Sequence, residues 1–296
     1  MSIAMTGTQA SNLKNSFAPF DVALANALHR NITVALEEDV GNCDLTGELV
    51  PANQRVNAQV IVRESAVLCG APWFDAVMIA LDASIGIDWQ YAEGDLMDAN
   101  SIVCKINAPA RALLTAERSA LNFLQLLSAV ATATRNYVDI VAGTNAAILD
   151  TRKTLPGLRL AQKYAVRVGG GQNQRLALYD GILIKENHIA AAGGIAASLK
   201  AAQALNTGVS IQVEVESLDQ LEQALTSGAR SILLDNFNTE MMRAAVEMNR
   251  GVALLEASGG IDISSVRPIA ETGVDRISIG SLTKDVKATD YSLRIV

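Results

Sequence analysis

From about residue 145 to the C-terminus, short apolar runs alternate with amphipathic stretches. Each run ends in a polar residue, and the runs occupy residues 146–153, 181–188, 211–217, 231–237, 252–260 and 276–282. Between them lie segments such as LDQLEQALTSGA, in which apolar residues recur with the helical period. Strands that are apolar on both faces and separated by helices are typical of parallel βαβ units. The pattern predicts an irregular parallel α/β barrel, closed or nearly closed, with an open doubly wound sheet as the alternative.

The earlier part of the chain has a different pattern. NAQVIVRESAVLCG and NSIVCKINAPARALLT alternate between apolar and polar residues, which predicts antiparallel strands with one buried face. PWFDAVMIAL predicts a helix between them. A long helix, or two consecutive helices, should follow, with Thr115 as the N-cap.

These two patterns divide the chain into domains. We expect a flexible N-terminus over residues 1–20, an N-terminal α/β sandwich domain over 21–128 and a barrel over 129–284. Within 285–296, YSLRIV is a candidate strand that returns to the first domain.

The composition excludes several classes of protein. The 296 residues are 50% hydrophobic and carry a net charge of −7, which argues against nucleic acid as a partner. No run of about 18 apolar residues occurs, so no membrane span is expected. Three cysteines without a C-x-x-C motif predict reduced thiols in the cytoplasm, and two distant histidines argue against a zinc site.

Charge is unevenly distributed along the chain. Residues 152–185 contain seven lysines and arginines but one acid, Asp180. A basic patch on an acidic protein indicates a small anionic ligand or an acidic partner surface, with chance clustering as the alternative. Both candidate folds bind ligands at the carboxyl ends of their strands. The polar residues predicted there are Asp150, Arg152, Lys153, Lys185, Glu214, Asp235, Glu256, Ser258 and Gly280.

Four cations could converge at these strand ends: Arg152, Lys153, Arg175 and Lys185. Arginine can bind a carboxylate or phosphate through two hydrogen bonds, whereas lysine acts as a mobile point charge. Arg118 lies in the predicted first turn of its helix, where a cation opposes the helix dipole. It is either an anion ligand or an ordinary surface arginine.

Two acids, Glu214 and Asp235, end consecutive predicted strands. They are either ion-pair partners of the cations or ligands of a hard divalent cation such as Mg²⁺. The glycines of GGGQNQR, EASGG and SIGSL could approach a phosphate, or they could be ordinary turn glycines.

A basic stripe recurs along GLRLAQKYAVR, at Arg159, Lys163 and Arg167. The i, i+4, i+8 spacing places these residues on one helix face. That face is either solvated or contacts a subunit or the edge of the site. The chain has no nucleophilic triad, Walker A motif or G-x-G-x-x-G motif, so positioning and charge stabilisation are the expected chemistry.

The chain resembles one family over many long motifs in order. From about residue 25 to the C-terminus it is similar to quinolinate phosphoribosyltransferase, the decarboxylating nicotinate-nucleotide pyrophosphorylase, in TAERSALN, DTRKTLPGLR, QKYAVRVGGG, LIKENHI, VEVES, LLDNF, LEASGG and GVDRISIGSLT. In the N-terminal part, EEDVGNCDLTGELV and VRESAVLCGAPWF also match.

The resemblance implies a pentosyltransferase of NAD biosynthesis. It would convert quinolinate and 5-phosphoribosyl-1-diphosphate into nicotinate mononucleotide, diphosphate and CO₂, with Mg²⁺ as cofactor. Both substrates are polyanions, which agrees with the basic patch. The resemblance also implies a homo-oligomer, a dimer or a hexamer of dimers, in which Arg63 is lent across the interface.

The resemblance also assigns roles to residues. Lys153 matches a position near the reacting centre, where it could deliver the proton that replaces CO₂. Glu214 and Asp235 match residues that hold the ribose and the Mg²⁺–diphosphate, and complete the catalytic set. The remaining substrate-binding candidates, around the quinolinate carboxylates and in the phosphate loops, are Arg118, Thr151, Arg152, Gln174, Arg175, Lys185, Ser258, Gly259, Gly260 and Gly280.

One position departs from the family pattern. Gln174 stands where the family usually has histidine, and glutamine can donate a hydrogen bond but cannot become a cation near neutral pH. Two other functions remain open. One is a molybdenum-associated relative of the same fold that acts on another acid, and the other is a non-catalytic anion-binding barrel.

Overall fold

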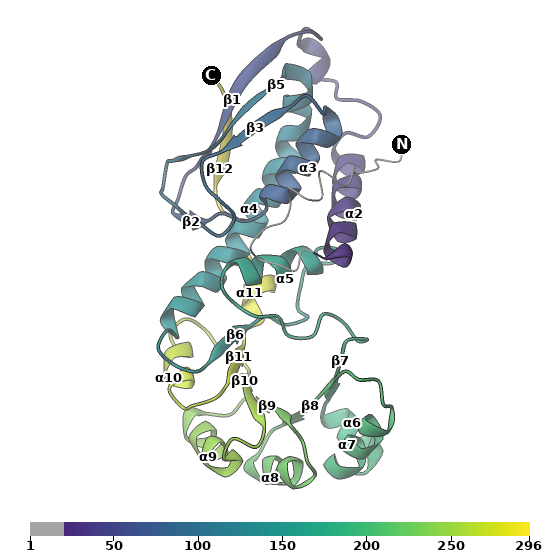
Figure 1. Cartoon of the computed structure of the whole chain (residues 1–296), viewed down its shortest axis with the longest axis vertical. Coiled ribbons are helices and arrows are strands. Elements are labelled where there is room, and N and C mark those ends of the chain that lie inside the picture. Colours follow the sequence, from purple (N-terminus) through teal and green to yellow (C-terminus); the bar gives the residue numbers. More distant parts are fainter. Residues whose placement is uncertain (1–20) are drawn as a thin grey trace. The chain divides into compact units, whose positions relative to one another are not determined.

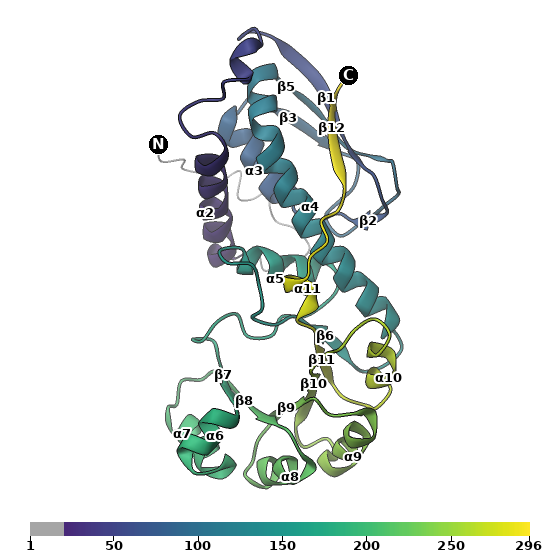
Figure 2. The same ribbon diagram turned by 180° about the vertical axis from the view of Figure 1, so that it is seen from behind.

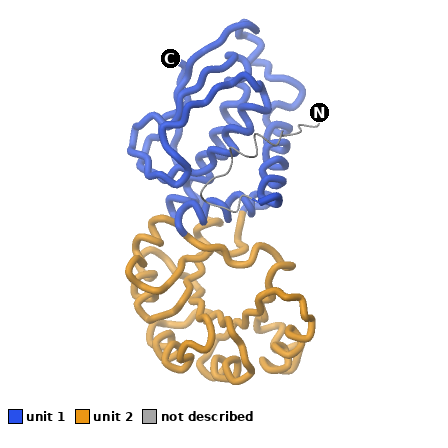
Figure 3. Tube along the Cα trace, viewed as in Figure 1, with its two compact units in different colours: residues 1–133, 155–170, 286–296 blue, residues 134–154, 171–285 orange. Residues whose placement is uncertain are grey.

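The structure is a computed structural model and describes residues 21–296. The expected flexible segment 1–20 lies outside the described residues. Two compact units are distinguished by colour in Figure 3. The first takes the described residues up to 133 together with 155–170 and 286–296, and the second takes 134–154 and 171–285.

An antiparallel sheet forms the first unit, in the order β12-β1-β5-β3. Its strands are β1 (Arg55–Val62), β3 (Gly86–Trp89), β5 (Ile102–Pro109) and β12 (Tyr291–Ile295). Alternate residues of β1 are buried, as the predicted one-sided burial requires. The predicted C-terminal strand is confirmed, because β12 lies along β1 with Val60 opposite Leu293 (Figure 2).

Helices and a second, two-stranded antiparallel sheet complete this unit. The predicted helix after the first strands is α3 (Ala71–Leu81), and β2 (Ala66–Val67) lies in the first segment predicted to form strands. The sequence-based prediction has no counterpart for α2 (Val22–Asp39), β3 or β4 (Leu96–Met97). The core packs Trp73 and Phe74 of α3 against apolar residues of the sheet. A mixed α/β N-terminal domain is therefore confirmed.

The long helix α4 (Ala110–Ile140) begins five residues before the predicted N-cap. Thr115 is not a cap: its hydroxyl donates to the Arg111 carbonyl oxygen (2.9 Å) inside the helix and to Asp44 Oδ2 (2.8 Å). Arg118 consequently lies beyond the first turn, so the dipole argument for it is wrong. The segment ARALLT belongs to this helix and not to the predicted strand, because a short amphipathic stretch satisfies either period.

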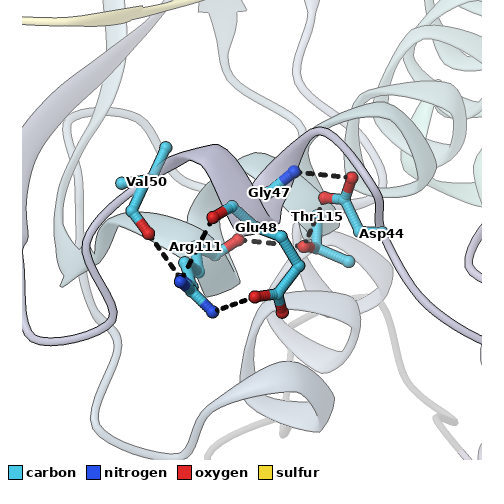
Figure 4. Close-up of polar contacts among 6 residues, drawn as sticks. All are labelled: Asp44, Gly47, Glu48, Val50, Arg111 and Thr115. Carbon is cyan, nitrogen blue, oxygen red and sulfur yellow. Dashed lines mark hydrogen bonds and ion pairs between the residues drawn. The ribbon is translucent and has the colours of Figure 1, made fainter.

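The segment before β1 is tied to α4 by one arginine (Figure 4). It includes a 3₁₀ turn, η1 (Gly47–Leu49). Arg111 donates from Nε to the Val50 carbonyl oxygen (2.6 Å) and from Nη1 to Glu48 Oε2 (2.7 Å). Asp44 accepts the Gly47 N–H at 2.9 Å. Asp44 thus contacts both the 3₁₀ turn and, through Thr115, the helix α4.

The helix that carries the basic stripe is α5 (Arg159–Val168), and this stripe does not form a solvated face. Lys163 is 1% exposed, and buried residues extend around most of the helix. Tyr164 packs its ring 5.4 Å from that of Trp73. The i, i+4 spacing was correct, but helical spacing does not show which side of a helix is covered.

Glu93 joins α3 to α5 within the first unit. Its carboxylate accepts the N–H of Gly70 (2.7 Å), the N–H of Ala71 (3.2 Å) and the hydroxyl of Tyr164 (3.1 Å). The residue as a whole is half-buried, but its carboxyl group is enclosed. This burial raises the pKa of Glu93 to about 7, although the three hydrogen bonds lower the pKa. Ionised Glu93 therefore lowers the stability of the fold.

We expect the free energy of unfolding to fall as pH rises from 4.5 to about 7, because native Glu93 retains a proton that the unfolded chain releases. Asp75, whose pKa burial raises to about 6, adds a smaller contribution. Glu93→Gln should reduce this pH-dependent decrease in the free energy of unfolding by up to about 3 kcal/mol. Urea unfolding at several pH values measures the slope. Glu222→Gln on the exposed side of α8 (Leu218–Thr226) is the control, and an unchanged slope in Glu93→Gln would contradict the assignment.

A six-stranded parallel sheet forms the second unit, in the order β6-β11-β10-β9-β8-β7. Every predicted apolar run coincides with one strand, although β8 begins one residue before its run: β6 (Ala147–Leu149), β7 (Gly181–Ile184), β8 (Ser210–Val215), β9 (Ser231–Asp235), β10 (Leu254–Ser258) and β11 (Arg276–Ser278). The predicted parallel barrel-type fold is confirmed. In the described part of the chain, β6 and β7 are the edge strands of this sheet.

Helices follow the strands of the second unit and lie outside their arc (Figure 1). Besides α8 they are α6 (Glu186–Ala192), α7 (Ile195–Ala204), α9 (Thr239–Asn249) and α10 (Val266–Ala270). The short helix α11 (Ser281–Lys284) follows β11. Ser217 and Asn238 accept backbone N–H groups at the starts of α8 and α9, and so fix where the preceding strand ends. Across residues 21–296, no helix is both long and apolar enough to cross a membrane.

Candidate active site

A pocket of about 740 Å³ opens at the carboxyl ends of the parallel strands. All of its lining residues belong to the second unit. The pocket brings together the predicted site residues Thr151, Arg152, Lys153, Gln174, Arg175, Lys185, Glu214, Asp235, Ser258, Gly259, Gly260 and Gly280. Two predicted residues, Arg63 and Arg118, belong to the first unit and do not line it.

Cations dominate one part of the pocket wall. Arg175 is half-buried and donates from Nη1 to the Gly181 carbonyl oxygen at 3.1 Å. Burial lowers the pKa of Arg175, and the charge of Arg152 lowers it further. Two guanidinium groups that repel each other in a partly desolvated wall favour an anion between them.

The acids occupy neighbouring strands. Glu214 is the penultimate residue of β8 and is buried, and both of its oxygens accept from Lys185 Nζ, at 3.2 and 3.0 Å. Burial raises the pKa of Glu214, Lys185 lowers it and the charge of Asp235 raises it again. Asp235 Oδ2 accepts from the Asn236 side chain at 2.9 Å. The structure thus supports the ion-pair interpretation for Glu214 while leaving two carboxylates at the mouth.

These carboxylates are suited to one particular kind of metal. No three His, Cys, Asp or Glu side chains within the described residues are grouped so as to hold a metal ion. Mg²⁺ in enzymes is commonly held by one or two carboxylates together with water and phosphate oxygens. The electrostatic coupling of Asp235 to Glu214 is what such a cation would relieve. The pair therefore fits Mg²⁺ that binds together with a phosphorylated ligand.

The segment that carries Gln174 and Arg175 is held against β6. Gln172 forms a parallel bridge with Leu149, which extends the edge of the sheet. Asp150, fully buried, accepts the Gln174 N–H at 2.9 Å and the Asn173 side-chain amide at 2.6 Å. These bonds aim residues 174 and 175 at the pocket.

Close backbone approach requires a glycine at position 259. Its φ is +107°, and an added Cβ would lie 2.1 Å from Asn236 Oδ1 and 3.0 Å from the Asn236 backbone nitrogen. Gly280 has an ordinary φ, but its Cβ position lies 3.1 Å from Lys153 Cδ, so Lys153 extends over it. The glycine at 259 is therefore more than an ordinary turn residue.

The pocket also includes residues that the sequence reasoning missed. Asn236 lines it directly after Asp235, with a positive φ of 56°. Asp262, Lys284 and Asp285 line it as well. Asn236 could have been found from its position immediately after a strand end, whereas Lys284 and Asp285 follow no strand directly and gave no local signal.

The fold and the pocket define a class: parallel α/β proteins that bind a small polyanion at the carboxyl ends of their strands. Comparisons with known proteins specify the family. The model of the quinolinate phosphoribosyl transferase C-terminal domain matches residues 130–294, and that of the N-terminal domain matches residues 44–128. The chain belongs to the quinolinate phosphoribosyl transferase family.

Individual members of the family are similar in sequence to this chain over most of its length. The nicotinate-nucleotide pyrophosphorylase (carboxylating) of Mycobacterium leprae is 41% identical over 90% of this chain and 97% of its own length. A probable nicotinate-nucleotide pyrophosphorylase of Bacillus subtilis is 40% identical over 87% of this chain and 90% of its own. The solved structure of the Francisella tularensis nicotinate-nucleotide pyrophosphorylase is 44% identical, covers 92% of this chain and 96% of its own, and superposes with a TM-score of 0.89.

Proposed function

We propose that this protein transfers the phosphoribosyl group of 5-phosphoribosyl-1-diphosphate to quinolinate, and so forms nicotinate mononucleotide, diphosphate and CO₂ for NAD biosynthesis. The observation that carries the proposal is the composition of one pocket. Arg152, Lys153, Arg175 and Lys185 line it together with two carboxylates. A site for anions alone has no use for acids at its mouth.

Binding is the first task of these residues. Arg152 and Arg175 are the residues suited to hold the two carboxylates of quinolinate, because guanidinium groups can donate two parallel hydrogen bonds. The backbone around Ser258, Gly259 and Gly260 admits a phosphate, since no side chain on Gly259 blocks its approach. Glu214 and Asp235 would hold Mg²⁺, which supplies charge neutralisation for the diphosphate.

The reaction then follows from position and charge. The pyridine nitrogen forms a bond to C1 of the ribose as the bond from C1 to the diphosphate breaks. The ring nitrogen becomes cationic and stabilises the electron pair left on C2 when the 2-carboxylate departs as CO₂. A proton from Lys153 reaches that carbon in our scheme, and the nearby cations stabilise the negative charge that develops.

Product analysis tests this function against its alternatives. The protein is incubated with quinolinate, 5-phosphoribosyl-1-diphosphate and Mg²⁺ while CO₂ release is followed, with nicotinate as the control acid. CO₂ and nicotinate mononucleotide from quinolinate, and no product from nicotinate, support the proposal. Turnover of another acid only would indicate the molybdenum-associated class of relative. Binding without turnover would indicate a non-catalytic barrel.

Assembly and location belong to the same proposal. We infer a homo-oligomer in which Arg63 completes the site of a second subunit. Arg63 is half-buried and its guanidinium donates to Ser292 Oγ at 2.7 Å, which holds it at one edge of the first unit's sheet. Sedimentation analysis tests the assembly, because a monomer at assay concentrations would contradict it. Cys69 and Cys104 are free, buried thiols, in keeping with a reducing cytoplasmic location.

Gln174→His is expected to lower the KM for quinolinate up to about fivefold at pH 6, and less at pH 8, because an imidazolium can donate one N–H to a carboxylate and the other to Gln212 Oε1, which accepts from Gln174 in the wild type. The KM for 5-phosphoribosyl-1-diphosphate should stay unchanged. Initial rates at both pH values measure the effect, with Gln223→His on the exposed side of α8 as the control. No change at either pH would show that this position does not contact the substrate.

A further inference from the structure

The interior of the parallel sheet is polar at the floor of the pocket, where Glu256 is among the lining residues. Alternate residues of a strand face the same side, so Gln212 shares a side with Glu214, and Glu256 shares one with Ser258. Gln212 is 6% exposed and Glu256 is 1% exposed. Branched apolar residues usually fill this layer in α/β barrels. Burying an amide and a carboxyl group there costs free energy unless both form hydrogen bonds.

These two buried groups form a chain that ends at the pocket wall. Gln212 Nε2 donates to Glu256 Oε2 at 2.9 Å, and Gln174 Nε2 donates to Gln212 Oε1 at 2.8 Å. At the other end of its amide, Gln174 Oε1 accepts the Arg175 backbone N–H at 2.6 Å. Hydrogen bonds therefore run from β10 through β8 to the residue that presents a guanidinium to the pocket.

The chain also determines which way each amide points. An amide has a donor end and an acceptor end, so a bond at one end fixes the group that is offered at the other. When Gln212 gives its NH₂ group to Glu256, it presents its oxygen to Gln174. Gln174 must then present its NH₂ group to Gln212 and its oxygen to the Arg175 N–H. Orientation set in the buried layer is passed on to the pocket wall.

We propose that Gln212 and Glu256 are positioning residues for the acidic substrate: acting through the Gln174 side chain, they fix the wall segment that carries Arg175. The proposal rests on the proposed function, which makes Arg175 a ligand of a quinolinate carboxylate. Asp150 binds the backbone N–H of Gln174 in the same segment but not the Gln174 side chain. The hydrogen bonds from Glu256 through Gln212 fix that side-chain amide. Neither Gln212 nor Glu256 touches the reacting atoms in this scheme.

Gln212→Met keeps the volume and removes both hydrogen bonds. We expect the KM for quinolinate to rise about tenfold, as for the loss of other supporting hydrogen bonds around a site. The KM for 5-phosphoribosyl-1-diphosphate and kcat should stay within about twofold, because the phosphate loops and Lys153 lie on other segments. Gln223→Met makes the same change on the exposed side of α8 and should alter none of these constants. An unchanged quinolinate KM in folded Gln212→Met would overturn the proposal.

A double-mutant cycle separates positioning from general loss of structure. If Gln212 acts through Gln174, then Gln212→Met should raise the quinolinate KM in the wild type but add less than about twofold in a Gln174→Ala background. Equal effects in both backgrounds would mean that Gln212 does not act through Gln174, and the proposal would be wrong.

A second variant keeps the test decisive if Gln212→Met does not fold. Glu256→Gln preserves the volume but replaces an acceptor by an amide that can point either way. It should raise the quinolinate KM at least about threefold in the wild type and not in Gln174→Ala, whereas no change in either would overturn the proposal. Wild-type turnover of quinolinate is measured in parallel. Its absence would reject the proposed function itself, and its presence with unaltered variants would reject only the positioning role.

Discussion

Lys153→Ala is expected to lower kcat for CO₂ release about a thousandfold, because it removes both a proton donor and a charge near the reacting centre. Lys153 is exposed within the pocket and extends over Gly280, so it can reach a bound ligand. Single-turnover measurements of CO₂ and nicotinate mononucleotide are the direct assay. Lys200→Ala on the exposed side of α7 removes a lysine far along the chain and should leave kcat unchanged.

Lys153→Arg distinguishes the two roles of this lysine. Arginine keeps the positive charge but does not release a proton near neutral pH. If the charge is what matters, the arginine variant should recover most of the activity. If the proton matters, it should bind both substrates and remain nearly as slow as the alanine variant. Nearly full turnover in Lys153→Ala would show that the residue has no part in the chemistry.

Glu214→Gln should raise the concentration of Mg²⁺ needed for half-maximal rate at least about tenfold, together with a loss of kcat. In the wild type, Lys185 Nζ lies 3.0 Å from a Glu214 oxygen. The amide of the variant can still accept a hydrogen bond from Lys185, but it offers no charge to a metal. Magnesium titrations at saturating substrates provide the measurement, with Glu222→Gln as the exposed control.

The outcome for Asp235→Asn should resemble that for Glu214→Gln, because the two carboxylates act as a pair. A Mg²⁺ dependence that is unchanged in both variants would remove the metal assignment. Such a result would leave the Glu214–Lys185 contact as a structural ion pair only.

The errors of the sequence-based prediction share one origin. The local pattern predicts Thr115 at a helix start. It also offers a solvated face as one interpretation for the stripe that includes Lys163. Both predictions use only neighbouring residues. Thr115 instead contacts Asp44, and Lys163 is enclosed. Partners that lie far along the chain decided both cases, and no local period contains that information.

The sequence by itself determined which segments form the parallel strands, their approximate ends and the charges at those ends. It could do so because continuous apolar runs report burial on both faces, and parallel strands all end at the same edge of a sheet. Only the tertiary structure decided that β12 pairs with β1, that Asp150 aims the segment bearing Arg175, and that Gln174, Gln212 and Glu256 form one chain of hydrogen bonds. Such contacts depend on strand register and side-chain direction in the packed sheet, and a shift of one residue in β8 or β10 would turn Gln212 or Glu256 to the opposite face.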